Sequence, residues 1–144
     1  MAENLQELRV ALEKAEEAKD DVKIANCALD VGLYLLSEGK LPQAEEQFTR
    51  VIKLAEANKD NEEMEKVLGE TYLVRGNILM GKSLYDQAVY LLELAIAKFI
   101  KFSNYNRLAS AHRVLSKAYL SLGDSGKAKE MEDTAKYYSK KADS

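Results

Sequence analysis

The chain has few of the residues that interrupt helices. Its 144 residues include one proline, seven glycines and no tryptophan. Long stretches are instead rich in alanine, leucine, glutamate and lysine, which are strong helix formers. Few residues remain that favour turns, and few runs of β-branched residues that favour strands. The composition therefore predicts an all-α fold, and the length fits a single domain with its own core.

One cysteine and one histidine limit the chemistry that the chain can perform. Cys27 alone cannot form an intramolecular disulfide or a thiolate zinc site, and His112 alone cannot form a histidine metal cluster. Both residues occupy positions where we expect helix packing, which argues against a nucleophile and base pair. The glycines are scattered singly along the chain, so a glycine-rich phosphate loop is absent. We therefore expect no catalysis, no metal and no cofactor.

Long apolar runs are also missing. No stretch approaches the roughly 18 apolar residues of a membrane-spanning helix. Residues 1–7 are acidic and lack the charged-then-apolar layout of a signal peptide. These features predict a cytoplasmic protein without a membrane partner. An isoelectric point near 5.3 is unsuited to sequence-independent nucleic-acid binding, so we expect no nucleic-acid partner.

Charge is distributed unevenly along the chain. Residues 1–93 hold 19 acidic and 11 basic residues, whereas residues 94–123 hold no acidic residue at all. This second stretch contains Lys98, Lys101, Arg107, Arg113 and Lys117. Such a basic surface fits an acidic peptide or a phosphate-bearing partner. The alternative is that these side chains only solvate exposed helix faces.

Apolar spacing of three and four residues predicts seven helices. The first covers residues 3–19, the second 21–38, and the fourth runs from about residue 60 to residue 80. Short polar breaks separate the others, and Pro42 fits the first turn of the third helix. Gly39, Gly81 and Gly123 lie 42 residues apart and predict the turns of three helical hairpins, the second turn being about two residues longer. The first helix has no hairpin partner, and we expect it to pack on the first hairpin as an N-terminal cap.

A short frame recurs three times. A small residue is followed three positions later by an aliphatic or aromatic residue and twelve positions later by an alanine. The copies begin at Gly32, Gly76 and Ser116, with Ala44, Ala88 and Ala128 as the alanines. Repeats of this kind form stacked helical hairpins that bury their apolar faces against one another. We expect one domain over 1–144, with a cap at 1–20 and repeats at 21–59, 60–103 and 104–141.

This pattern resembles the tetratricopeptide repeat family. The second repeat carries the resemblance best, with Tyr72, Gly76, Leu79, Tyr85, Ala88, Leu92 and Ala95. The repeats exceed the family's usual length of about 34 residues. They are similar to the longer-helix variant of kinesin light chains, Leu-Gly-Asn repeat adaptors and bacterial quorum-response regulators. In the third repeat, Glu132 stands where an aromatic residue is usual. The resemblance implies a right-handed superhelix of three hairpins behind a capping helix.

The resemblance also implies a peptide-binding groove on the first helix of each hairpin. Matching the family's register assigns to that groove Asn26, Leu29, Leu33, Leu36, Leu73, Asn77, Met80, Arg113, Lys117 and Leu120. Several of these leucines could instead belong to the core. The function that this implies is an adaptor or scaffold that binds a peptide segment of a partner protein. Self-assembly through apolar surfaces, as a homo-oligomer or a chaperone-like protein, is the alternative.

Overall fold

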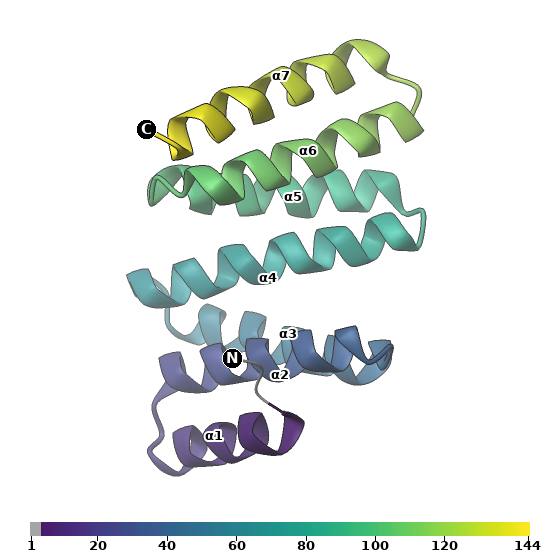
Figure 1. Ribbon diagram of the computed structural model, residues 1–144. Helices are drawn as coiled ribbons and strands as arrows, with labels where there is room; N and C mark the ends of the chain where they lie inside the picture. Colours follow the sequence, from purple (N-terminus) through teal and green to yellow (C-terminus); the bar gives the residue numbers. More distant parts are fainter. Residues whose placement is uncertain (1–3) are drawn as a thin grey trace. The chain divides into compact units, whose positions relative to one another are not determined.

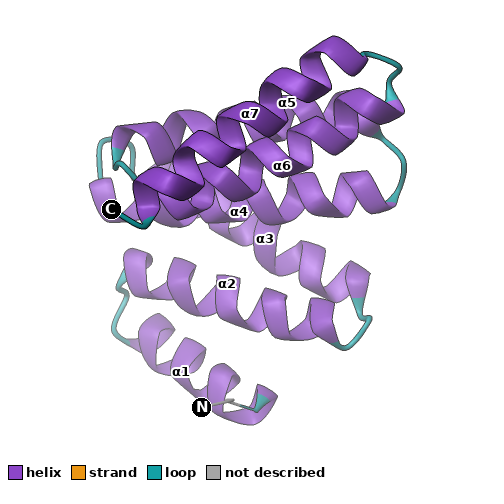
Figure 2. Cartoon of the chain, turned by 45° about the horizontal axis from the view of Figure 1, so that its top comes forward, coloured by secondary structure: helices purple, strands orange, loops and turns teal. Residues whose placement is uncertain are grey.

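The computed structural model describes residues 4–144, and residue 3, where we expected the first helix to begin, lies outside them. Over the described residues the fold is all-α, with seven helices and no strand (Figures 1 and 2). The helices are α1 (Leu5–Glu17), α2 (Asp21–Ser37), α3 (Leu41–Ala57), α4 (Glu62–Gly81), α5 (Tyr85–Lys101), α6 (Tyr105–Ser121) and α7 (Ser125–Ala142). The predicted class and number of helices are confirmed.

Polar caps define where several of the helices begin. The side chains of Asn4, Asp20, Asn104 and Asp124 each accept a hydrogen bond from the backbone N–H three residues further on, at 2.9 to 3.3 Å. Such a bond satisfies one of the N–H groups that a helix start leaves without a partner. Helix α3 has no side-chain cap, and Pro42 lies in its first turn as expected.

The turns within the hairpins differ from the sequence prediction at one point. All three connections are three residues long, at 38–40, 82–84 and 122–124, so the second turn is not longer. The residue with positive φ in the second turn is Ser83 (61°), which corresponds to Gly39 (75°) and Gly123 (85°). Gly81 is the last residue of α4 instead. The extra length of this repeat therefore lies in α4, which has 20 residues where α2 and α6 have 17.

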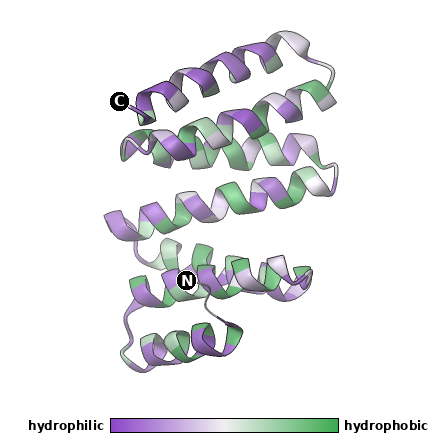
Figure 3. Cartoon of the chain, viewed as in Figure 1, coloured by the Kyte–Doolittle hydropathy of each residue, from purple (hydrophilic) through white to green (hydrophobic). Residues whose placement is uncertain are grey.

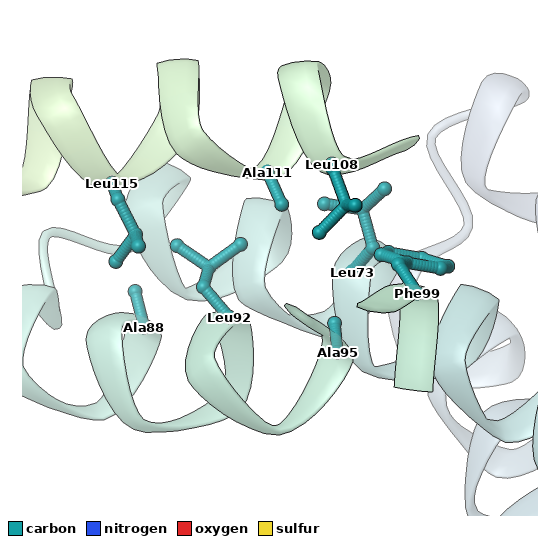
Figure 4. Close-up of a cluster of buried hydrophobic side chains, with 8 residues drawn as sticks. All are labelled: Leu73, Ala88, Leu92, Ala95, Phe99, Leu108, Ala111 and Leu115. Carbon is teal, nitrogen blue, oxygen red and sulfur yellow. The ribbon is translucent and has the colours of Figure 1, made fainter. Parts of the chain in front are cut away.

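The chain divides into two compact units, Met1–Thr71 and Tyr72–Ser144, with the boundary inside α4. In the first unit, α1 packs on α2 and α2 packs on α3. In the second, α5 packs on α6 and α6 packs on α7. A buried cluster joins the end of α4 to α5 and α6, and consists of Leu73, Ala88, Leu92, Ala95, Phe99, Leu108, Ala111 and Leu115 (Figure 4). Helix α7 is hydrophilic along most of its length and fully buries only Ala128 and Ala135 (Figure 3).

Helices α1–α3 and α5–α7 are two copies of one arrangement. Helix α2 begins at Asp21 and α6 begins at Tyr105, 84 positions later, and both are 17 residues long. Lys19 and Ser103, also 84 positions apart, both have positive φ in the turn before these helices, at 54° and 53°. A residue in the first unit can therefore be matched with one in the second, and differences between the matched residues point to specialised surfaces.

Close helix contacts occur at the small residues of the repeated frame. A Cβ atom added to Gly32 would lie 2.5 Å from Cε1 of Phe48, and one added to Gly76 would lie 2.9 Å from Cδ2 of Leu92. Both distances are far shorter than an ordinary carbon contact. At the third position the hydroxyl of Ser116 donates to the backbone carbonyl of Ala128 at 2.8 Å. The small residue thus allows the second helix of each hairpin to approach the first.

Candidate functional site

The first unit holds four of the residues that the family register assigns to a groove. Asn26, Leu29, Leu33 and Leu36 lie three or four positions apart on α2, and so share one face of the helix. Leu29 is buried at 8% exposure, whereas Leu33 is 40% exposed. The exposed Asn26 side chain donates to the carbonyl of Val22 at 3.0 Å. Leu29 is therefore a core residue, and Leu33 is the apolar side chain that this face presents to solvent.

In the second unit, the end of α4 contributes Leu73, Asn77 and Met80. Leu73 is 5% exposed and belongs to the buried cluster (Figure 4). Met80 is half-buried and packs against the same cluster, whereas Asn77 is exposed. Leu73 corresponds to Leu29 in the repeat register, and both are core residues. This agrees with the alternative that several of the assigned leucines belong to the core and not to a groove. Asn77 corresponds to Leu33, and both are exposed.

Helix α6 contributes Arg113, Lys117 and Leu120. All three are exposed, Leu120 at 60%. The guanidinium of Arg113 donates to the hydroxyl of Ser139 on α7. Arg113 therefore already has a partner in the second unit, so that changing it would also alter α6 and α7. Lys117 occupies the register position of Leu33 and Asn77, so this position is exposed in all three hairpins.

The five basic residues of the stretch 94–123 lie on α5 and α6. Lys101 has its ammonium 5.5 Å from the centre of the Phe102 ring, and Lys98 is half-buried. Arg107 and Lys117 are exposed on α6. Counted over the whole second unit, 12 basic residues stand against seven acidic ones, whereas residues 1–71 hold nine basic and 17 acidic residues. The two units thus carry opposite net charge.

A shallow pocket of the second unit was not anticipated from the sequence. It has a volume of about 400 Å³, and Arg75, Leu79, Gln87, Tyr90 and Leu91 are among the residues that line it. Tyr90 is 66% exposed. No sequence signal marks this pocket, because a single exposed aromatic residue such as Tyr90 is ordinary on a protein surface.

One ionisable side chain near the second hairpin turn is perturbed. Hydrogen bonds with the hydroxyls of Ser83 and then Ser121 lower the pKa of Tyr85 below its usual value, against a small opposing effect of burial. In the neutral form, the Tyr85 hydroxyl donates to Oγ of Ser83 at 3.3 Å. The pKa falls because serine hydroxyls can donate to the phenolate instead.

His112 and Cys27, the single histidine and the single cysteine of the chain, lie in different units. His112 is 8% exposed, its Nδ1 lies 2.8 Å from the carbonyl oxygen of Leu108, and its ring lies 5.5 Å from that of Tyr138. Cys27 is half-buried and belongs to the other unit. Among residues 4–144, no group of three or more histidine, cysteine, aspartate or glutamate side chains is arranged to hold a metal ion.

No helix within the described part of the chain is long and apolar enough to cross a membrane. No protein-family model, curated protein or solved structure matches the chain.

Proposed function

We propose that the chain is a protein-interaction module of the tetratricopeptide repeat type, which binds a peptide segment of a partner protein and performs no catalysis. The observation that carries the proposal is the repeated exposure of one register position. Leu33, Asn77 and Lys117 are exposed, whereas the residues four positions earlier include the buried Leu29 and Leu73. A position that every hairpin leaves in solvent is free to carry recognition residues.

The chemistry at this position suits a peptide. In the second unit, the Asn77 amide can both donate to and accept from a peptide backbone. Lys117 supplies a positive charge, and Leu120, 60% exposed one turn further on, supplies an apolar contact. The excess of basic residues in this unit favours an acidic segment as the ligand. A cytoplasmic adaptor or scaffold is the role that these features support.

The test compares baits that differ only at the exposed position. Wild type and the variant Asn77→Ala/Lys117→Glu are used to capture proteins from a cell lysate, which are then identified by mass spectrometry. The control bait is Asn106→Ala/Lys136→Glu, which makes the same chemical changes at exposed positions of α6 and α7. Arg113 is left unchanged because of its bond to Ser139.

We expect proteins that the control bait retains and the Asn77→Ala/Lys117→Glu bait loses. Exposed substitutions usually change stability by less than about 0.5 kcal/mol, so both variants should keep the wild-type circular dichroism spectrum and melting temperature. Equal capture by all three baits would contradict the proposed binding face.

Self-assembly is the second candidate function, and the opposite net charge of the two units favours it. One copy's acidic unit could bind another copy's basic unit, which would give a head-to-tail assembly. Light scattering over a range of protein concentrations tests this directly. Assembly driven by charge predicts a mass that rises with concentration and falls back to that of the monomer as salt screens the charges. A constant monomer mass excludes it.

A further inference from the structure

The first unit contains a cleft between α1 and α3 with a volume of about 350 Å³. Its floor is apolar and is formed by Leu12, Val31 and Leu35, whose side chains are otherwise buried. Its walls are polar, with Glu13 and Glu16 on α1 and Glu46 and Gln47 on α3 among the residues that line it. An apolar floor beneath convergent polar groups is the usual form of a binding site.

Comparison with the second copy of the arrangement shows how two residues that line the cleft differ from their counterparts. The residues 84 positions after Leu35 and Gln47 are Tyr119 and Met131. Tyr119 is larger than Leu35, and Met131 is more apolar than Gln47. Both Tyr119 and Met131 pack against the core of the second unit, and the ammonium of Lys127 lies 5.3 Å from the centre of the Tyr119 ring. The first unit has a shorter residue at one of these positions and a polar residue at the other, and both of them line the cleft.

The charges around the cleft favour a cation. Of the charged residues that line it, three are glutamates and one, Arg9, is basic. Glu16 already forms an ion pair with Arg50, which leaves Glu13 and Glu46 on opposite walls. The surrounding unit has nearly twice as many acidic as basic residues. Its field therefore attracts a positively charged ligand towards the cleft.

Gln47 adds a neutral acceptor to these carboxylates. Its Oε1 atom is buried and receives no hydrogen bond within the described structure. A buried acceptor without a donor is unfavourable, so a ligand that brings a donor to Gln47 gains more than one that meets a solvated group. Gln47 is also one of the residues that line the cleft, so this acceptor belongs to its wall.

We propose that this cleft binds an arginine side chain of a partner protein. The aliphatic stem covers Leu12 and Leu35, and the guanidinium donates to the carboxylates of Glu13 and Glu46 and to Oε1 of Gln47. Arginine suits acceptors on two walls because its planar head carries five donors in a fixed fork, whereas lysine offers a single compact charge. The inference rests on a protein-binding role for the chain but not on the face that carries Asn77 and Lys117.

The test uses the isolated side chain as the probe. The isotope-labelled protein is titrated with N-acetylarginine N-methylamide, and amide shifts are followed by nuclear magnetic resonance. A ligand of this size binds weakly, with a Kd on the order of 1–10 mM, which the method measures readily. We expect shifts confined to residues around the cleft, including the side-chain amide of Gln47. The neutral citrulline analogue should bind about tenfold more weakly, since it loses the charge-assisted hydrogen bonds.

Two variants make the assignment specific. Leu35→Tyr/Gln47→Met places in the cleft the two side chains that the second unit already accommodates, and it should abolish the shifts. Glu13→Gln/Glu46→Gln leaves the volume unchanged and should weaken binding about tenfold, which keeps the test valid if the first variant unfolds. The control is Glu56→Gln/Lys59→Gln, at exposed positions away from the cleft, which should bind as wild type does.

The lysine analogue, N-acetyllysine N-methylamide, is titrated in the same way. Three results would overturn the inference: shifts that the cleft variants leave unchanged, citrulline binding equal to arginine binding, or lysine binding at least as tight as arginine binding. None of them bears on capture through Asn77 and Lys117. Conversely, equal capture by the three baits would contradict the binding face at Asn77 and Lys117 without changing the result of the arginine titration. The two proposals can therefore be refuted independently.

Discussion

Replacement of Gly32 by alanine tests the packing of the first hairpin most sharply, because two effects of opposite sign compete. Alanine favours a helix over glycine by about 1 kcal/mol, so an exposed glycine in α2 would give a more stable variant. At Gly32, however, the added Cβ would lie 2.5 Å from Cε1 and 3.0 Å from Cδ1 and Cζ of Phe48. Phe48 is completely buried, so its ring cannot turn into solvent.

Overpacking of a well-filled core costs roughly 1–3 kcal/mol. The contact is about 1 Å shorter than the optimal carbon separation and involves a rigid ring, so we expect the upper part of that range. After the gain in helix propensity, Gly32→Ala should lower the free energy of unfolding by about 1–2 kcal/mol. The measurement is urea unfolding followed by circular dichroism at the helix band.

Two further variants identify the cause. Gly126→Ala in α7 is the control, because its Cβ would meet only Oδ1 of Asp124 at 3.6 Å, and it should be neutral or stabilising. Phe48→Leu removes the ring, so its combination with Gly32→Ala should cost about 1 kcal/mol less than the two single changes added together. A Gly32→Ala protein more stable than wild type would refute the close approach of α3 to α2.

The other predictions concern the first two hairpin turns. Ser83→Gly should stabilise the protein by about 0.5–1 kcal/mol, because glycine adopts the φ of 61° without a Cβ clash, and Gly39→Ser should destabilise it by a similar amount in the same urea assay. Loss of stability in Ser83→Gly would show that its hydroxyl matters more than its backbone. Ser83→Gly should also return the pKa of Tyr85 towards its usual value, as measured by the absorbance of the phenolate during alkaline titration. Because folding lowers the pKa of Tyr85, its ionisation stabilises the folded state at pH values above the unfolded pKa. This contribution is lost as the pH falls through the folded pKa. If stability depended on alkaline pH in the same way in Tyr85→Phe, this account of Tyr85 would be contradicted.

The helices could be predicted from the sequence because their signals are local. Apolar spacing and polar caps such as Asp20 and Asn104 fix where helices run and begin. The second turn was mispredicted because equal glycine spacing suggested Gly81, whereas Ser83 takes the left-handed conformation. The spacing of Ala44, Ala88 and Ala128, which is 44 and then 40 residues, differs from the equal spacing of Gly39, Gly81 and Gly123. The alanines lie at helix contacts, whereas Gly81 lies at a helix end with nothing within 4 Å of an added Cβ atom.

The candidate site could be predicted only in part. The family register assigned Leu33, Asn77, Lys117 and Leu120 to a groove, and all four are exposed, but it assigned the buried Leu29 and Leu73 to the same groove. One helical face contains both kinds of residue, and burial depends on neighbouring helices that periodicity does not specify. The α1–α3 cleft could not be predicted because its lining residues come from three helices, and the sequence does not specify how those helices are placed.

The most direct test of the proposed function is a calorimetric titration of the protein with a purified partner from the lysate capture. The proposal predicts at least about tenfold weaker binding by Asn77→Ala/Lys117→Glu, corresponding to a loss of about 1.4 kcal/mol, with unchanged binding by Asn106→Ala/Lys136→Glu. Equal affinities of all three proteins for that partner would contradict it.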